Sequence, residues 1–308
     1  MGPLLFLIYI NDMVLYLNSV LKLCLFADDN TIYGSCNNLP ELFSLMHSQL
    51  RPFLDWVKFN QLTINWSKTK LMFMTNKRRI SFPPHFVIDK NSVEVVQEFR
   101  LLGVNIDNKL SFKKHVENIK CLVNRKLFSI KKIFYLSQSV KLQFFKTFIL
   151  PHFDYCSSLV IHFSKTLLNN LENFFNVCIY RLFKKSLSDL TINLQLKSLE
   201  EFRIYPFKIR IFYRLNIFCF KIVNKQILIN FYNNLVFNDQ LSFRKRELVH
   251  VPFERTKGGS TRLSIFFPKF INNVLKNSIN LNFSDFCSSL RINIIIIYDI
   301  FIKNFSIF

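Results

Sequence analysis

The sequence predicts an α+β protein in which short antiparallel strands, backed by helices, are followed by a mostly helical remainder. Residues 21–33 read LKLCLFADDNTIY, two short β-prone runs around a polar centre, which is typical of a strand, a tight turn and a returning strand. From residue 112 to residue 134 apolar side chains recur at intervals of three and four, as on one face of a helix. Half of the 308 residues are hydrophobic and 16% are aromatic, which is enough to build a substantial core.

Charge is distributed unevenly along the chain. Lys and Arg number 41 against 20 Asp and Glu, so the formal net charge is +21. Residues 1–60 nevertheless contain three basic and five acidic side chains, whereas the other 248 residues contain 38 basic and 15 acidic ones. The acidic first part is suited to cations, and the basic remainder is suited to a polyanion such as nucleic acid.

Several other classes of protein are disfavoured by the sequence. The seven cysteines form no CxxC pair and the six histidines are scattered, so we expect reduced thiols and no regularly spaced zinc site. The apolar stretch 4–10 has no basic segment before it, unlike a signal peptide. The apolar run 294–297 is far shorter than the ~20 residues of a membrane span.

Two adjacent carboxylates, Asp28 and Asp29, lie at the tip of the predicted hairpin. Successive strand residues point to opposite faces, so one carboxylate can bind a hard cation while its neighbour lies at the rim. Asp-Asp-Asn is also favourable turn chemistry, so the local sequence by itself leaves an ordinary turn as the alternative.

Five sequence blocks follow one another within the first 116 residues. They are GPLLFLIYIND at 2–12, FADD at 26–29, NQLTINWSKTKLMF at 60–73, FRLLGVNID at 99–107 and LSFKKHV at 110–116. In order and spacing these blocks resemble the reverse transcriptases of non-LTR retrotransposons, the LINE-type elements of the jockey and CR1 kind. The resemblance covers residues 2 to about 125 and is looser in the C-terminal part.

This resemblance implies an RNA-directed DNA polymerase that joins nucleotides by two-metal phosphoryl transfer. It implies Mg²⁺ or Mn²⁺ as cofactor and an RNA template, a DNA primer and dNTPs as partners. By the same resemblance Asp28 would bind the metal ions, Asp29 would support it, and Lys68 would lie near the triphosphate as a third catalytic residue. An ordinary surface lysine is an equally good interpretation of Lys68. A primer-grip-like hairpin would be formed by Leu101, Leu102, Gly103 and Val104.

The family pattern also includes a further metal-binding Asp on a strand upstream of the GPxLF helix, and no such residue precedes Met1. We therefore expect a fragment that does not polymerise on its own, cut from a parent that does. The alternative is a catalytically dead, basic RNA- or DNA-binding relic. A location inside the cell, in the nucleus or in a cytoplasmic ribonucleoprotein, follows from the same resemblance.

Basic side chains cover the predicted helix after Ser111, which we expect to be its N-cap. We expect nucleic-acid backbone contacts from Lys113, Lys114, Lys120, Arg125 and Lys126, and from a second basic segment with Arg244, Lys245 and Arg246. A solvated amphipathic helix is the alternative for any one of these lysines.

We expect three segments: a partial palm at 1–110, a helical thumb and connection at 111–190, and a mainly helical basic region at 191–308. Further helices are predicted at 140–150, ending before Pro151, at 166–183, and at 198–223 with an interruption at Pro206. A helical protein bound to an anionic membrane surface is a third, poorer reading of the whole chain.

Overall fold

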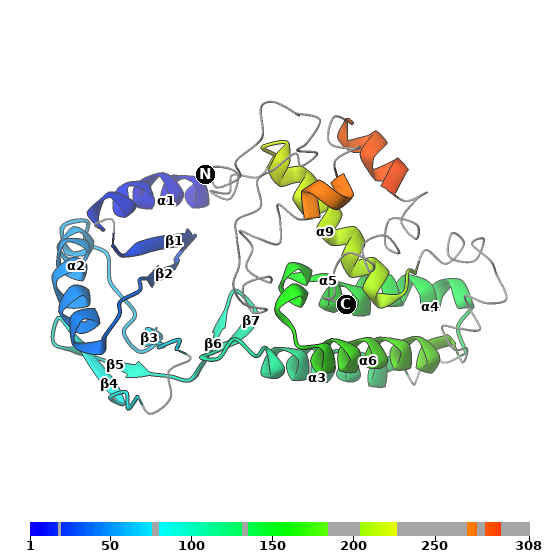
Figure 1. Ribbon diagram of the computed structural model, residues 1–308, viewed down its shortest axis with the longest axis horizontal. Helices are drawn as coiled ribbons and strands as arrows, with labels where there is room; N and C mark the ends of the chain where they lie inside the picture. Colours follow the sequence, from blue (N-terminus) through cyan, green and yellow to red (C-terminus); the bar gives the residue numbers. More distant parts are fainter. Residues whose placement is uncertain are drawn as a thin grey trace, which may run out of the picture. The chain divides into compact units, whose positions relative to one another are not determined.

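The computed structural model describes residues 1–17, 20–75, 80–130, 135–183, 204–226, 270–275 and 281–290. The chain divides into two compact units, Met1–Phe99 and Arg100–Phe308, and the boundary falls within strand β6 (Glu98–Leu101). The described part of the first unit combines helices with short strands, and that of the second is mostly helical, which confirms the predicted α+β class (Figure 1). The predicted segment boundaries at residues 110 and 190 stay a prediction.

The first unit begins with helix α1 (Gly2–Ile10), which continues into the 3₁₀ helix η1 (Asn11–Tyr16). Helix α1 is apolar all round, yet Ile10 is its only buried residue. Leu4, Leu5 and Ile8 are 61%, 59% and 66% exposed. Apolar patches on the surface of a protein commonly mark a contact site or an aggregation liability.

Strands β1 (Lys22–Phe26) and β2 (Asp29–Tyr33) form the predicted antiparallel hairpin. Leu23 lies opposite Ile32, and both pack against the core of this unit, which is formed mainly by η1 and helix α2 (Leu39–Phe59). The alternate residues of β1, Lys22, Cys24 and Phe26, are exposed. One face of the hairpin therefore faces the core and the other is open.

Helix α2 is delimited by asparagines at both ends. The side-chain oxygen of Asn38 accepts a hydrogen bond from the Glu41 N–H at 2.9 Å, which makes Asn38 the N-cap, and its side-chain amide donates to the Glu41 carboxylate at 3.0 Å. Pro40 occupies the first turn, where its missing N–H has no helical acceptor. At the C-terminus the Asn60 amide donates to the carbonyl of Trp56 at 2.9 Å.

A small three-stranded sheet completes the first unit, with the order β3 (Lys70–Leu71), β5 (Asn91–Val95), β4 (His85–Ile88). Strands β4 and β5 are antiparallel, but β3 and β5 are parallel. The sheet is therefore mixed at a place where only antiparallel pairs were predicted. The parallel pair arises because β4 intervenes along the chain, so β5 returns in the direction of β3.

The second unit begins within β6, which forms a two-stranded sheet with β7 (Val104–Asp107). Its described helical elements include α3 (Lys113–Ile130), α4 (Gln138–Phe144), the π-helix η3 (Phe145–Ile149), α5 (Leu150–Asp154), the 3₁₀ helix η4 (Ser157–His162), α6 (Lys165–Phe183), α9 (Phe207–Val223) and the π-helix η6 (Ile271–Leu275). Residues 283–290 are also helical. Phenylalanine dominates the core, and the fully buried side chains include Phe145, Phe175, Phe207, Phe212 and Phe220.

Pro151 and Pro206 act differently on the helices of the second unit. The chain stays helical through Pro151, contrary to the predicted end at residue 150, because Pro151 lies in the first turn of α5 after the π-helical turn η3. Pro206 does mark a boundary, since α9 begins at Phe207.

The junction from β7 to α3 is organised by Asp107. Its Oδ1 accepts hydrogen bonds from the N–H groups of Lys109 (3.1 Å) and Ser111 (3.0 Å), and its Oδ2 accepts from the Ser111 hydroxyl (3.0 Å) and the Phe112 N–H (2.9 Å). The oxygen of Ser111 receives only a long contact of 3.5 Å from the Lys113 N–H. The prediction that Ser111 is the N-cap of α3 is therefore wrong, because the N–H groups of Ser111 and Phe112, directly before the helix, donate to the Asp107 carboxylate.

Some predicted features lie outside the described residues, among them Arg244, Lys245 and Arg246 and the start of the predicted helix at 198–223. Within the described ranges, no helix has the length and apolarity required to cross a bilayer. All seven cysteines are free thiols.

Candidate functional site

The two acids of the FADD block lie at the reversal of the hairpin. Phe26 pairs with Asp29, so Ala27 and Asp28 are the central residues of a two-residue turn. Ala27 has a φ of 52°, whereas Asp28 is outside the left-handed region, which is the pattern of a type II′ turn. Glycine is the usual residue at the first central position, and a non-glycine residue in such a sparsely populated conformation costs about 1–3 kcal/mol. The rest of the hairpin therefore holds a strained turn next to the two carboxylates.

Both carboxylates are accessible. Asp28 and Asp29 are exposed, and the strand register places Asp29 on the same face as Phe26, which is 64% exposed. The neighbouring pair, Leu25 and Asn30, is on the opposite face, where Leu25 packs against the core. Apolar contacts on one face thus support the hairpin, and its acids meet solvent on the other.

The kind of donor at this tip fits a divalent cation, since carboxylate oxygens are the hard ligands that Mg²⁺ and Mn²⁺ prefer. The number of donors is smaller than a complete site needs. Among the described residues no group of three or more His, Cys, Asp or Glu side chains is arranged to hold a metal ion. The tip by itself thus presents two accessible carboxylates, Asp28 and Asp29.

Contacts between distant sequence blocks support the helix that precedes the hairpin. The Trp56 indole N–H donates to Asp12 Oδ2 at 3.4 Å, and the Tyr9 hydroxyl donates to the carbonyl of Asn60. These contacts join the first sequence block, which contains Tyr9 and Asp12, to the end of α2. Reading the sequence alone did not assign them, although all four residues lie in or beside the blocks that carry the family resemblance.

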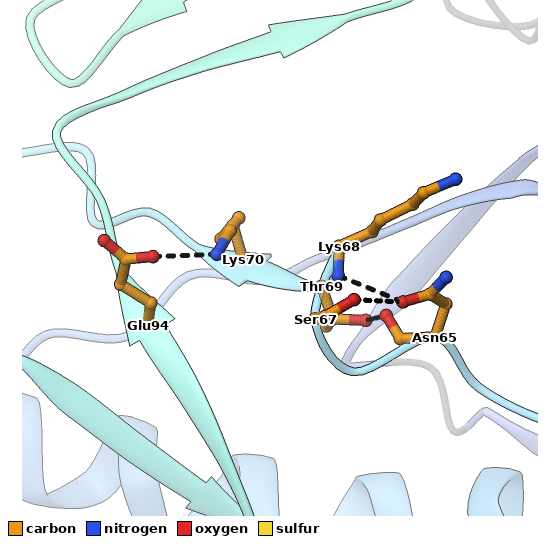
Figure 2. Close-up of polar contacts among 6 residues, drawn as sticks. All are labelled: Asn65, Ser67, Lys68, Thr69, Lys70 and Glu94. Atoms are coloured by element: carbon orange, nitrogen blue, oxygen red, sulfur yellow. Dashed lines mark hydrogen bonds and ion pairs between the residues drawn. The ribbon is translucent and has the colours of Figure 1, made fainter.

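Asn65 builds the turn that presents Lys68. Its side-chain oxygen accepts hydrogen bonds from the Ser67 hydroxyl at 2.7 Å and the Lys68 N–H at 3.2 Å, and its main-chain carbonyl accepts from the Thr69 hydroxyl at 2.9 Å. Figure 2 shows the Lys68 side chain extending away from this turn. Lys68 is exposed, whereas nearby Lys70 forms an ion pair with Glu94 at 2.7 Å. Of these two lysines, Lys68 is the one available to a bound anion.

The predicted primer-grip-like hairpin is present as β6 and β7. Leu102 and Gly103, with φ values of 46° and 83°, form its two-residue turn, and two positive φ values are typical of a type I′ turn. Leu101 is half-buried at the end of β6 and Val104 is buried at the start of β7. Leu102 is 39% exposed at the tip, so this hairpin presents an apolar side chain to solvent.

The five basic residues predicted on α3 fall into two groups. Lys113, Lys114 and Arg125 are exposed. Lys120 instead contacts the Asn170 side chain and the Phe174 ring of α6, and Lys126 donates to the Phe148 carbonyl at 3.1 Å. The first group is available to a polyanion, while the second also ties α3 to its neighbours.

Comparison with known proteins relates the N-terminal third of the chain to reverse transcriptases. Residues 1–106 match the family model described as "Reverse transcriptase (RNA-dependent DNA polymerase)". Over 167 residues the chain is 25% identical to the "Retrovirus-related Pol polyprotein from type-1 retrotransposable element R1 2" of Nasonia vitripennis, an alignment that covers 51% of this chain and 40% of that protein. Over 164 residues it is 29% identical to the "Probable RNA-directed DNA polymerase from transposon X-element" of Drosophila melanogaster, covering 50% of this chain and 18% of that protein.

The matched regions thus span less than half of either curated relative. No solved structure matches the chain significantly. The resemblance predicted from the sequence blocks is nevertheless confirmed: the chain is related to the reverse transcriptases of non-LTR retrotransposons.

Proposed function

We propose that hairpin β1–β2 carries metal-binding acids of an RNA-directed DNA polymerase active site and that the second unit binds the primer–template duplex. The observation that carries this proposal is the pair Asp28 and Asp29, exposed at a strained turn within the residues that match the reverse transcriptase family. A location inside the cell, where such templates occur, is part of the same proposal.

Each part of the site has a chemical task under this proposal. Divalent ions, when bound, stabilise the attacking 3′ oxygen and the departing pyrophosphate. Asp28 and Asp29 hold such ions, and the ammonium of Lys68 offsets negative charge on the triphosphate. Because two acids are an incomplete ligand set, the chain by itself binds primer–template without extending it.

Mn²⁺ tests the metal-binding part of the proposal, since it broadens the NMR signals of nearby nuclei. In the purified chain, Mn²⁺ should selectively broaden the amide signals of residues 27–30, and the double variant Asp28→Asn, Asp29→Asn should abolish this effect. Asp55→Asn is the matched control, since Asp55 is an exposed acid of helix α2 in the same unit. Equal broadening in the double variant would contradict the assignment.

Lys68 and Lys70 provide a matched pair for the triphosphate. Lys68→Ala should weaken binding of a Mn²⁺–dNTP complex by about threefold to tenfold, the effect of losing one charge-assisted contact. Lys70→Ala should change it by less than about twofold, because the Lys70 ammonium is paired with Glu94. Equal effects of the two changes would show that Lys68 has no special position.

Binding of nucleic acid without catalysis is the second candidate function, favoured by the exposed basic side chains of α3. The affinity for an RNA–DNA duplex should fall with salt, and Lys114→Ala or Arg125→Ala should each reduce the slope of log K against log salt by about one. Lys126→Ala should reduce it less, because Lys126 contacts Phe148. Salt-independent binding would contradict this function.

Primer extension tests whether the ligand set is incomplete. The chain alone should bind the duplex and add no nucleotides in Mg²⁺. Extension that is lost on Asp28→Ala would show a complete catalytic site and would overturn the proposal that the ligand set is incomplete.

A further inference from the structure

The turn between β6 and β7 is held from outside the hairpin by Tyr155. The Tyr155 hydroxyl donates a hydrogen bond to the main-chain carbonyl of Leu102. The Tyr155 ring also covers Gly103, since a Cβ added to Gly103 would lie 3.4 Å from a ring carbon. Both contacts lie within the second unit and join positions more than 50 residues apart in the sequence.

The position of Tyr155 is itself set by the helices of this unit. Tyr155 follows α5, and its N–H donates to the Pro151 carbonyl at 2.9 Å. The preceding Asp154 has a largely buried side chain and accepts hydrogen bonds from Arg210, with Nε to Oδ1 at 2.6 Å, and from Arg214 at 2.8 Å. Both arginines belong to α9, so the residue directly before Tyr155 is joined to another helix of the unit.

The turn needs such support. Type I′ turns strongly prefer Asn, Asp or Gly at their central positions, because both residues take positive φ. Here the first central residue is Leu102, with a φ of 46°. Leucine disfavours a positive φ, so the hydrogen bond from the Tyr155 hydroxyl to the Leu102 carbonyl stabilises the observed conformation of the turn. The conformation in turn exposes the Leu102 side chain.

We propose that Tyr155 is a positioning residue that fixes the Leu102–Gly103 tip for contact with the 3′-terminal nucleotides of the primer strand. This inference rests on the proposed function, in which the second unit binds the primer–template duplex, and it assigns the primer end to the primer-grip-like hairpin β6–β7. Leu102 makes the contact through its apolar side chain, and Tyr155 acts through Leu102. The hydroxyl is the essential group, because the ring alone leaves the carbonyl orientation unspecified.

The test uses Tyr155→Phe, which keeps the ring and removes the hydroxyl. Tyr180→Phe is the matched control, because Tyr180 belongs to helix α6 of the same unit and is 54% exposed, against 53% for Tyr155. In the full chain without ligand, amide hydrogen exchange at Gly103 and Val104 should accelerate about threefold to tenfold in Tyr155→Phe, as expected for one hydrogen bond. The control should exchange as the wild type does.

A second readout places the tip on the primer. p-Benzoylphenylalanine introduced in place of Leu102 should photo-crosslink to the last nucleotides of a labelled DNA primer annealed to RNA. In the Tyr155→Phe background the yield at these nucleotides should fall at least about threefold and spread along the primer, while duplex affinity changes less than about twofold. A purely structural role for Tyr155 would leave the crosslink distribution unchanged.

The outcomes distinguish the inference from the proposed function beneath it. Primer-end crosslinks that persist unchanged in Tyr155→Phe, or unchanged amide exchange at the tip, would overturn the role of Tyr155 alone. Absence of primer crosslinks with the wild-type tyrosine present would overturn the role of the hairpin in primer binding, and the inference with it.

Discussion

Replacement of Asp107 by asparagine is expected to destabilise the second unit by about 1–2 kcal/mol. The Asp107 carboxylate accepts four hydrogen bonds, two on each oxygen, at the point where β7 leads into α3. Asparagine keeps the shape and one acceptor oxygen. Its amide group cannot accept, so two of the four donors lose their partner and face another donor.

The same reasoning ranks a second change. Asp107→Ala removes both acceptor oxygens, so all four hydrogen bonds are lost, and it should cost about 2–3 kcal/mol, more than Asp107→Asn. Glu117→Gln is the control, because Glu117 is an exposed carboxylate on α3, the helix that follows Asp107. It should change stability by no more than about 0.5 kcal/mol.

The pH dependence has a definite sign. Burial raises the pKa of Asp107, but the hydrogen bonds from Ser111, Phe112 and Lys109 outweigh it and hold the pKa below its usual value. A lowered pKa in the folded state means that this contribution to stability is complete above the unfolded pKa of about 3.9 and is lost as the pH falls through the folded value. Asp107→Asn should lack this component of acid destabilisation.

Urea unfolding followed by pulsed thiol labelling measures these changes in the second unit. Cys178 and Cys219 are buried there, so their labelling reports unfolding of this unit without interference from the first. The acid dependence is followed by circular dichroism as the difference between wild type and variant. Equal stability of Asp107→Asn and wild type, or an identical acid dependence, would refute the reasoning.

Two further predictions concern surfaces and thiols. Leu5→Glu should reduce self-association in light scattering with little change in melting temperature, because Leu5 is 59% exposed. Ile10→Glu, at a site that is 3% exposed, should instead destabilise the first unit by about 3 kcal/mol or more. Unchanged self-association in Leu5→Glu would contradict the exposure of α1. Burial raises the pKa of Cys178 to about 12, so its thiol should stay unlabelled at pH 8 while exposed Cys121 reacts, and equally fast labelling of both would show that the core is open.

The hairpin with Asp28 and Asp29 was predictable because its signal is local. Alternating β-prone residues and a polar turn lie within thirteen consecutive positions, and both strands pair with their nearest neighbour in the chain. The apolar face of α3 was predictable for the same reason, since Val116, Ile119, Val123 and Leu127 are buried as their spacing indicates.

Which basic side chains of α3 contact neighbouring helices was not predictable in this way. Helical spacing places Lys120 and Lys126 on α3, but only the packing of α6 and η3 beside that helix decides that these two ammonium groups are engaged within the unit. The cap of α3 is a similar case. Ser111 has the expected type and position, yet the carboxylate of Asp107, brought back by the turn after β7, takes the donors.

The sequence by itself determined the family relationship, the α+β class, the place of the acidic hairpin and the excess of positive charge after residue 60. Each of these depends on residue type and on spacing along the chain. The tertiary structure decided which charged groups remain available and which distant residues hold a turn in place, as Tyr155 holds Leu102 and Asp154 holds α9. Such contacts join residues more than 50 positions apart, and no local pattern specifies them, because they exist only once the core has packed.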